Sequence, residues 1–169
     1  MVKKAPVVFK HNVLVVVDMQ PCFEATRNSW MINSVSERLR EARNRADHII
    51  FLEYTDLEKG DRRTWEPTHP ELLQIVQKPY YCYWDILIKD EDDGSSWIKA
   101  HLDRIKVKPI SFNVCGVNLD YCVFDTVRGL ANLYKTTPIN VLKGSINGEG
   151  HQPKNWSKFN TIKTANIIG

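Results

Sequence analysis

The sequence predicts an α/β fold in which helices cover both faces of a doubly wound, mainly parallel sheet. Continuous apolar runs such as Val13 to Val17 are typical of strands buried on both faces, as in parallel sheets. Amphipathic segments alternate with these runs, which indicates helices that join parallel strands through right-handed crossovers. A chain of 169 residues suits a single domain over 1–169.

The elements follow one another along the chain in the order of a Rossmann-like fold. After the strand at 13–17, Ser34 and Glu37 fit a capping box at the start of a helix, and Val35 and Leu39 share its apolar face. The other expected elements are strands over 48–52, 109–115 and 139–142, helices around 71–76, 95–105 and 121–134, and a closing helix or strand within 162–168.

Charge and hydropathy narrow the classes of partner. The formal charge is +3 and the basic residues are scattered, so the sequence does not favour nucleic acid. No apolar run approaches the roughly 20 residues of a membrane span, and the start of the chain lacks a secretory pattern. We therefore expect a cytoplasmic protein with no membrane partner. The cysteines form no CxxC pair, and we expect reduced thiols at Cys22, Cys82, Cys115 and Cys122.

Three residues are candidates for a functional site. Two of them lie where ligands bind in parallel sheets, and the third precedes a group of aromatic residues. Asp18 ends the first strand, and ligands bind at the carboxyl ends of parallel strands. Cys122 falls in the first turn of a predicted helix, where the helix dipole favours a thiolate. Lys78 precedes Pro79 and an aromatic cluster. The residues alone leave blander readings open: Asp18 as a turn cap, Cys122 as a packed apolar group and Lys78 as a surface residue.

Three blocks of the sequence, VVVDMQPCF from Val15, KPYYCYW from Lys78 and CGVNLDYCV from Cys115, resemble the signature blocks of the isochorismatase-like cysteine hydrolases. That superfamily includes nicotinamidases and N-carbamoylsarcosine amidohydrolases. The resemblance implies a catalytic triad of Asp18, Lys78 and Cys122 that cleaves a C–N bond of a small molecule through a thioester. It also implies a cis peptide between Val117 and Asn118, with the amides of Asn118 and Cys122 as the oxyanion hole.

The resemblance also directs attention to a substrate pocket and an assembly. Its aromatic candidates for the pocket wall are Phe23, Tyr81, Trp84 and Tyr121, and the aromatic run 80–84 suits either a pocket or an oligomer interface. Members of the family often assemble as homo-oligomers. Cys22 stands where many members have an acidic residue, either as a second thiol near the site or as a packed side chain.

A metal site is the main point of departure from nicotinamidases, which carry an Asp-x-His pair after the second strand. Here the corresponding residues are Asp56 and Glu58, and the nearest downstream histidine is His69. These side chains suit a hard or borderline cation, but we expect solvated loop residues and no cofactor. The alternatives to an amidase are a nicotinamidase with an atypical metal site and a catalytically silent binding member of the family.

Overall fold

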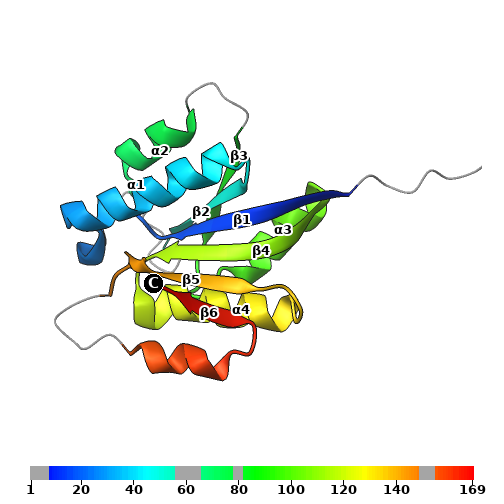
Figure 1. The fold of residues 1–169 in the computed structure, drawn as a ribbon. Coiled ribbons are helices and arrows are strands. Elements are labelled where there is room, and N and C mark those ends of the chain that lie inside the picture. The colour runs from blue at the N-terminus through cyan, green and yellow to red at the C-terminus, as the bar shows by residue number, and fades with distance from the viewer. Residues whose placement is uncertain (1–7, 56–65, 78–81, 149–154) are drawn as a thin grey trace, which may run out of the picture.

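A computed structural model describes residues 8–55, 66–77, 82–148 and 155–169. Its centre is a six-stranded sheet in the order β3-β2-β1-β4-β5-β6, with every neighbouring pair parallel (Figure 1). The strands are β1 (Phe9–Val17), β2 (His48–Tyr54), β3 (Tyr83–Lys89), β4 (Val107–Gly116), β5 (Ile139–Ile146) and β6 (Ala165–Ile168).

Helices cover both faces of the sheet, as the sequence predicts. One face holds α1 (Ser29–Asn44) and α2 (Pro70–Gln77), and the other holds α3 (Ser95–Arg104), α4 (Phe124–Leu133) and the 3-10 turn η4 (Trp156–Thr161) (Figure 1). Along β1, Leu14 and Val16 pack toward α1, while Val13, Val15 and Val17 pack toward the other layer. This two-sided burial explains why the run is apolar without interruption. None of these helices is long and apolar enough to cross a membrane.

The first helix begins earlier than the capping-box pattern suggests. It starts at Ser29, because buried Met31 extends the apolar face by one turn before Val35. Ser34 therefore lies inside the helix, and its hydroxyl donates to the carbonyl oxygen of Gly144 at 2.6 Å instead of capping the helix start. The expected capping box is wrong.

The strand β3 was not among the expected elements. It forms one edge of the sheet, and exposed Tyr83, Ile86 and Ile88 alternate irregularly with more buried residues. An edge strand with exposed positions lacks the continuous apolar run of a central strand. At the opposite edge, β6 shows that the closing segment is a strand.

The strand order places a topological switch between β1 and β4. From β1 the chain builds the sheet outward through β2 and β3, then returns to the other side of β1 as β4. The connections after β1 and β4 leave in opposite directions, and ligands bind in the crevice that opens there. Asp18 directly follows β1, and the segment that carries Cys122 directly follows β4.

Candidate active site

Asp18 is held in a strained turn at the carboxyl end of β1. Its φ is 48°, a left-handed conformation that side-chain-bearing residues adopt infrequently but that Asp tolerates. Its amide donates to the carbonyl oxygen of Leu52 at 3.0 Å, which continues the pairing with β2 by one residue. Its side chain is fully buried. A buried carboxylate is costly unless it is paired, so its partners decide what it can do.

Lys89, the last residue of β3, is that partner. Its Nζ lies 2.9 Å from Asp18 Oδ2, and both residues are at most 1% exposed. The ammonium group also donates to the carbonyl oxygen of Glu91 at 3.0 Å and lies 4.9 Å from the centroid of the Tyr54 ring. The structure thus has a buried, hydrogen-bonded ion pair at the carboxyl edge of the sheet.

Burial and charge act in opposite directions on Asp18. Desolvation raises the pKa of its carboxyl group, and the positive charge of Lys89 opposes this without cancelling it. The second oxygen, Oδ1, is buried and is not bonded to Lys89, and an interaction with the Cys122 side chain also lowers the pKa of the Asp18 carboxyl group. Asp18 is therefore a stronger base than an exposed carboxylate, with one oxygen not already occupied by Lys89.

Cys122 completes the group of buried reactive side chains. It lies in a π-helical turn, Leu119–Val123, between β4 and α4, and is 6% exposed. Its Sγ donates to Asp92 Oδ1 at 3.3 Å. Burial, followed by the negative charge of Asp18, raises the pKa of the thiol, and the charge of Lys89 opposes this.

The expected thiolate at a helix start is therefore wrong for the resting site. The turn that holds Cys122 precedes the first residue of α4, Phe124, and the thiol is buried beside carboxylates. Desolvation and negative charge outweigh the helix dipole here. Cys122 rests as a thiol, and a base must take its proton when the sulfur reacts.

The turn between β4 and Cys122 is tied closely to the end of β1. The peptide bond between Val117 and Asn118 is cis, as the resemblance implies. Gly116 has a φ of 117°, and a side chain there would collide with the backbone of Val17. The amide of Val117 donates to the carbonyl oxygen of Val17 at 2.9 Å. These contacts hold the Cys122 turn beside Asp18.

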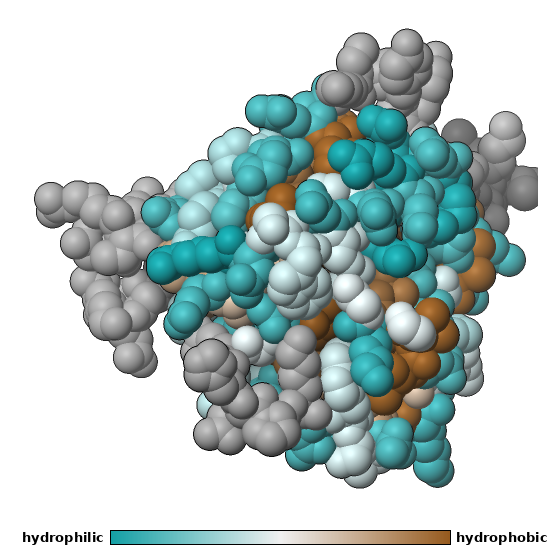
Figure 2. Space-filling model, turned by 60° about the vertical axis from the view of Figure 1, so that its left-hand side comes forward, coloured by the Kyte–Doolittle hydropathy of each residue, from teal (hydrophilic) through white to brown (hydrophobic). Residues whose placement is uncertain are grey.

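The acidic loop after β3 is anchored against α4. The amide of Gly94 donates to the Thr126 hydroxyl at 3.0 Å, and that hydroxyl lies 3.4 Å from the carbonyl oxygen of Asp92. The loop therefore presents an exposed Asp92 to Cys122. The face toward which β1 and β4 run carries hydrophilic side chains over much of its area, with hydrophobic patches among them (Figure 2).

The sequence reasoning missed Lys89 and Asp92. A signal was present: Lys89 follows the apolar residues Ile86, Leu87 and Ile88, as Asp18 follows its own apolar run. Because parallel strands end at the same edge, two such charged residues are expected to meet there. The expected triad lysine, Lys78, lies outside the described residues, and the lysine that the described structure brings to Asp18 is Lys89.

The structure separates the aromatic candidates. Phe23 contacts Tyr54 edge-on, with ring centroids 6.4 Å apart, and Tyr54 adjoins Lys89. Tyr121 is 57% exposed next to Cys122, whereas Tyr81 lies outside the described residues.

The expectation that Trp84 forms part of the pocket wall is corrected by the structure, because Trp84 lies near the start of β3 and packs against Phe51. At the rise of a β-strand, its five-residue separation from Lys89 is about 17 Å. It therefore lies near the amino ends of the parallel strands, and not in a pocket at Cys122, which follows the carboxyl end of β4.

Of the metal candidates, Asp56 and Glu58 lie outside the described residues. His69 Nε2 lies 2.9 Å from the Thr26 hydroxyl, and its Nδ1 lies 3.9 Å from a carboxylate oxygen of Glu71. Burial lowers the pKa of this imidazole. One ring nitrogen of His69 is thus already engaged within the protein. Cys22 is exposed near the site, and partial desolvation and the charge of Glu66 raise its pKa.

Comparison with known proteins finds likeness in structure alone. No family model and no curated protein matches the chain. A nicotinamidase from Staphylococcus aureus has a TM-score of 0.72 at 19% identity, covering 95% of this chain and 100% of its own. A ribonuclease from Caenorhabditis elegans has a TM-score of 0.72 at 17% identity, covering 96% of this chain and 79% of its own.

An N-carbamoylsarcosine amidase from Thermoplasma acidophilum has a TM-score of 0.66 at 17% identity, covering 93% of this chain and 95% of its own. These likenesses confirm the isochorismatase-like fold that the sequence predicts. Since the neighbours differ in the activities named for them, the chemistry of this chain has to be argued from its own side chains.

Proposed function

We propose that this protein is a cysteine hydrolase that cleaves a C–N bond of a small amide-type compound through a thioester on Cys122. The observation that carries the proposal is the buried ion pair of Asp18 and Lys89 beside a buried thiol, at the switch point of the sheet. Among structures of this fold, a nicotinamidase and an N-carbamoylsarcosine amidase support the choice of a C–N bond.

The proton of the thiol determines the first step. Because the pKa of Cys122 is raised, Asp18 takes the proton from Sγ as the sulfur attacks the carbonyl carbon of the substrate. The protonated Asp18 then gives the same proton to the leaving nitrogen, and the C–N bond breaks. In the second half, Asp18 takes a proton from water as the water oxygen attacks the thioester. The acid product leaves and Cys122 regains its proton.

Lys89 supports both carboxylate and sulfur through its charge. Its ammonium group lies 2.9 Å from Asp18 Oδ2 and favours the ionised form of that carboxylate, the form that can accept a proton. The same charge opposes the rise in the pKa of Cys122, so it stabilises the thiolate as it forms. We assign to Lys89 the role that the sequence reasoning gave to Lys78.

The oxyanion of the tetrahedral intermediate needs donors fixed in advance. We propose the backbone amides of Asn118 and Cys122, in the turn that hydrogen bonds tie to the end of β1. A second tie comes from the amide of Leu119, which donates to the carbonyl oxygen of Asn147 at 2.9 Å. A preorganised donor of this kind contributes about 3 kcal/mol to the transition state.

The acidic residues near Cys122 influence which substrate charge the site accepts. Asp92 is exposed and accepts the thiol hydrogen bond, within the acidic run Asp90 to Asp93. A substrate that reaches the sulfur therefore meets negative charge, which favours neutral or cationic amides over acidic ones. Phe23 and Tyr121 are the proposed aromatic walls.

The alternatives receive less support from the described residues. A nicotinamidase with an atypical metal site would use His69, whose Nε2 already faces Thr26. A catalytically silent member would keep a buried ion pair beside a thiol without using it, although burying both charges carries a desolvation cost. A homo-oligomer, a cytoplasmic location and the lack of a cofactor stay predictions from the sequence.

The test is a panel of neutral, cationic and acidic amides, ureido compounds and imides, followed by ammonia release with and without a chelator. We expect turnover that a chelator does not abolish, with a thioester on Cys122 detected by mass spectrometry. Cys122→Ala lowers turnover by roughly 10⁴-fold or more, whereas Cys22→Ser, which removes an exposed thiol, retains it. Full turnover in Cys122→Ala would overturn the proposal, and loss of turnover on chelation would favour the metal-dependent alternative.

A further inference from the structure

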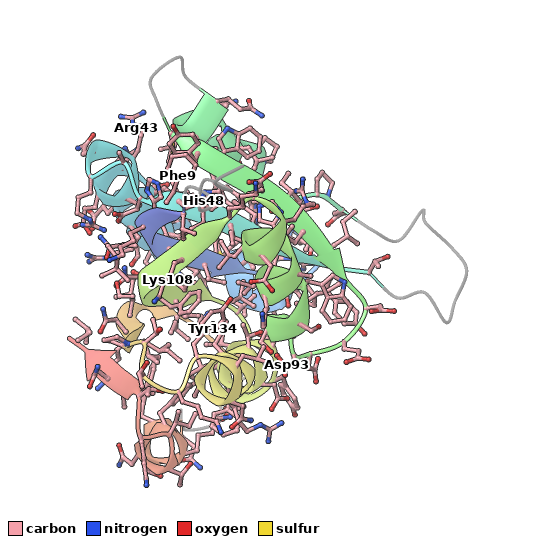
Figure 3. All side chains as sticks on the ribbon, turned by 90° about the vertical axis from the view of Figure 1, so that its right-hand side faces the viewer. Phe9, Arg43, His48, Asp93, Lys108 and Tyr134 are labelled. Carbon is pink, nitrogen blue, oxygen red and sulfur yellow. The ribbon has the colours of Figure 1, made fainter. Side chains whose placement is uncertain are left out.

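A second group of polar side chains, two buried histidines and a partly exposed carboxylate, lies at the amino edge of the sheet, where the parallel strands begin, away from Cys122. His48 is the first residue of β2, Asp85 lies early in β3, and His101 is near the end of α3. Figure 3 faces this edge and places His48 near Phe9, where β1 begins. The sequence reasoning attached no chemistry to these residues, and the proposed hydrolysis does not use them.

The three side chains converge on one carboxylate oxygen. His48 Nε2 lies 3.2 Å and His101 Nε2 lies 2.9 Å from Asp85 Oδ2. One ligand atom from each residue lies within 4.8 Å of the others. Two ligands at the usual distances from a tetrahedral zinc ion are about 3.4 Å apart. The group therefore needs only a small adjustment to surround one ion.

Burial makes the two imidazoles suitable ligands. Both histidines are at most 5% exposed, and His48 Nε2 makes no well-formed hydrogen bond to the described residues. A cavity of about 410 Å³ adjoins the group and is lined in part by His11, Cys82 and Tyr83. It leaves room for a water molecule as a further ligand.

We propose that His48, Asp85 and His101 form a binding site for a divalent transition-metal ion of the zinc class, with water from the adjoining cavity as a fourth ligand. Two imidazoles and one carboxylate suit borderline cations such as Zn²⁺ and Co²⁺. The site joins β2, β3 and α3, so a bound ion would tie the edge strand to the helix layer.

Arg104 controls access to this site. Its Nη2 lies 2.9 Å from His101 Nδ1, so the guanidinium donates to that nitrogen and the ring proton is on Nε2, facing Asp85. To bind an ion through Nε2, the ring must carry its proton on Nδ1 instead. A protonated Nδ1 cannot accept a hydrogen bond from Arg104, so the guanidinium must then move away. Arg104 is exposed and free to swing into solvent. It therefore competes with the metal for His101.

The experiment titrates the full-length protein with Co²⁺, followed by its visible absorption, and then displaces the Co²⁺ with Zn²⁺. We expect one tight site without the charge-transfer band of thiolate ligands. Replacing a ligand, as in His48→Ala, His101→Ala or Asp85→Asn, weakens binding roughly tenfold or more. Arg104→Gln, at an exposed position that does not threaten folding, tightens binding.

His69→Ala is the matched control, because it removes a histidine at the other edge of the sheet and should leave the affinity unchanged. The proposal is overturned if the wild-type protein does not bind Co²⁺, if the ligand variants bind as well as wild type, or if Arg104→Gln leaves the affinity unchanged or lowers it. Since the readout is metal affinity, the result does not depend on amide hydrolysis.

Discussion

The two edges of the sheet carry buried polar groups of different character, although β2 and β3 contribute to both. At the carboxyl edge, Asp18 and Lys89 form an ion pair closed to solvent. At the amino edge, His48 and His101 flank a carboxylate of Asp85 that is 37% exposed. At the first edge the two opposite charges already pair with each other. The second edge has ring nitrogens and an open side that a cation can occupy.

The largest expected change in stability comes from removing one partner of the ion pair between Asp18 and Lys89. Lys89→Met leaves the Asp18 carboxylate buried and unpaired, and should lower the free energy of unfolding in urea by about 3–5 kcal/mol and abolish turnover. The double variant Asp18→Asn with Lys89→Met should recover part of that stability. Lys78→Met is the matched control. If Lys78→Met abolishes turnover and Lys89→Met does not, the assignment of Lys89 is wrong.

The amino edge should respond to metal where the carboxyl edge does not. Zn²⁺ at 100 times its Kd should raise the free energy of unfolding of the wild-type protein by about 2.7 kcal/mol. At the same Zn²⁺ concentration a tenfold loss of affinity lowers this stabilisation by about 1.3 kcal/mol, so it should fall to about half or less in His48→Ala and should persist in Cys122→Ala, as measured by urea unfolding with and without Zn²⁺. Equal stabilisation in wild type and His48→Ala would place the ion elsewhere.

The carboxyl edge should instead respond to pH through Asp18. Its pKa is raised above the ordinary value of 3.8, so its contribution to stability is present below that pH and is lost as the pH rises through the folded pKa. The stability of the wild type relative to Asp18→Asn should therefore fall as the pH rises above about 4, by at most about 1.4 kcal/mol per pH unit. Urea unfolding of both proteins over this range measures the difference, and a rising difference would contradict the raised pKa.

The smallest effect concerns the thiol itself. At neutral pH, iodoacetamide should label Cys122 more slowly than a free thiol, because burial and Asp18 raise its pKa. Asp18→Asn removes negative charge and should speed labelling several-fold, with Asp92→Asn having a smaller effect in the same direction. Peptide mapping by mass spectrometry gives the rates. Faster labelling in wild type than in Asp18→Asn would restore the thiolate expected from the helix dipole.

Much of the fold was predictable because burial on both faces leaves a clear pattern. The central strand at Val13 to Val17 and the alternation with amphipathic helices were both recognisable in this way. The edge strand β3 was not, since its outer positions are exposed. The early start of α1 was missed because the contribution of Met31 to the core depends on tertiary packing.

The site divides in the same manner. Asp18 and Cys122 could be placed from local sequence, because each lies in a segment that directly follows a strand, whereas the cis peptide at Val117 was implied only by the family resemblance. Lys89 could not, since it meets Asp18 only after β3 has joined the sheet beside β2. Trp84 was misplaced for the same reason: proximity in sequence to a reactive block did not indicate which end of a strand it occupies.

The sequence by itself determined the alternating α/β architecture, the acid that follows the strand at 13–17 and the cysteine that follows the strand at 109–115. Hydrophobic periodicity and turn chemistry are local, so they can be recognised without a structure. Only the tertiary structure decided which lysine meets Asp18, that Cys122 rests as a thiol, and that two histidines share Asp85. These properties depend on desolvation and on charges from distant strands, which exist only once the sheet has assembled.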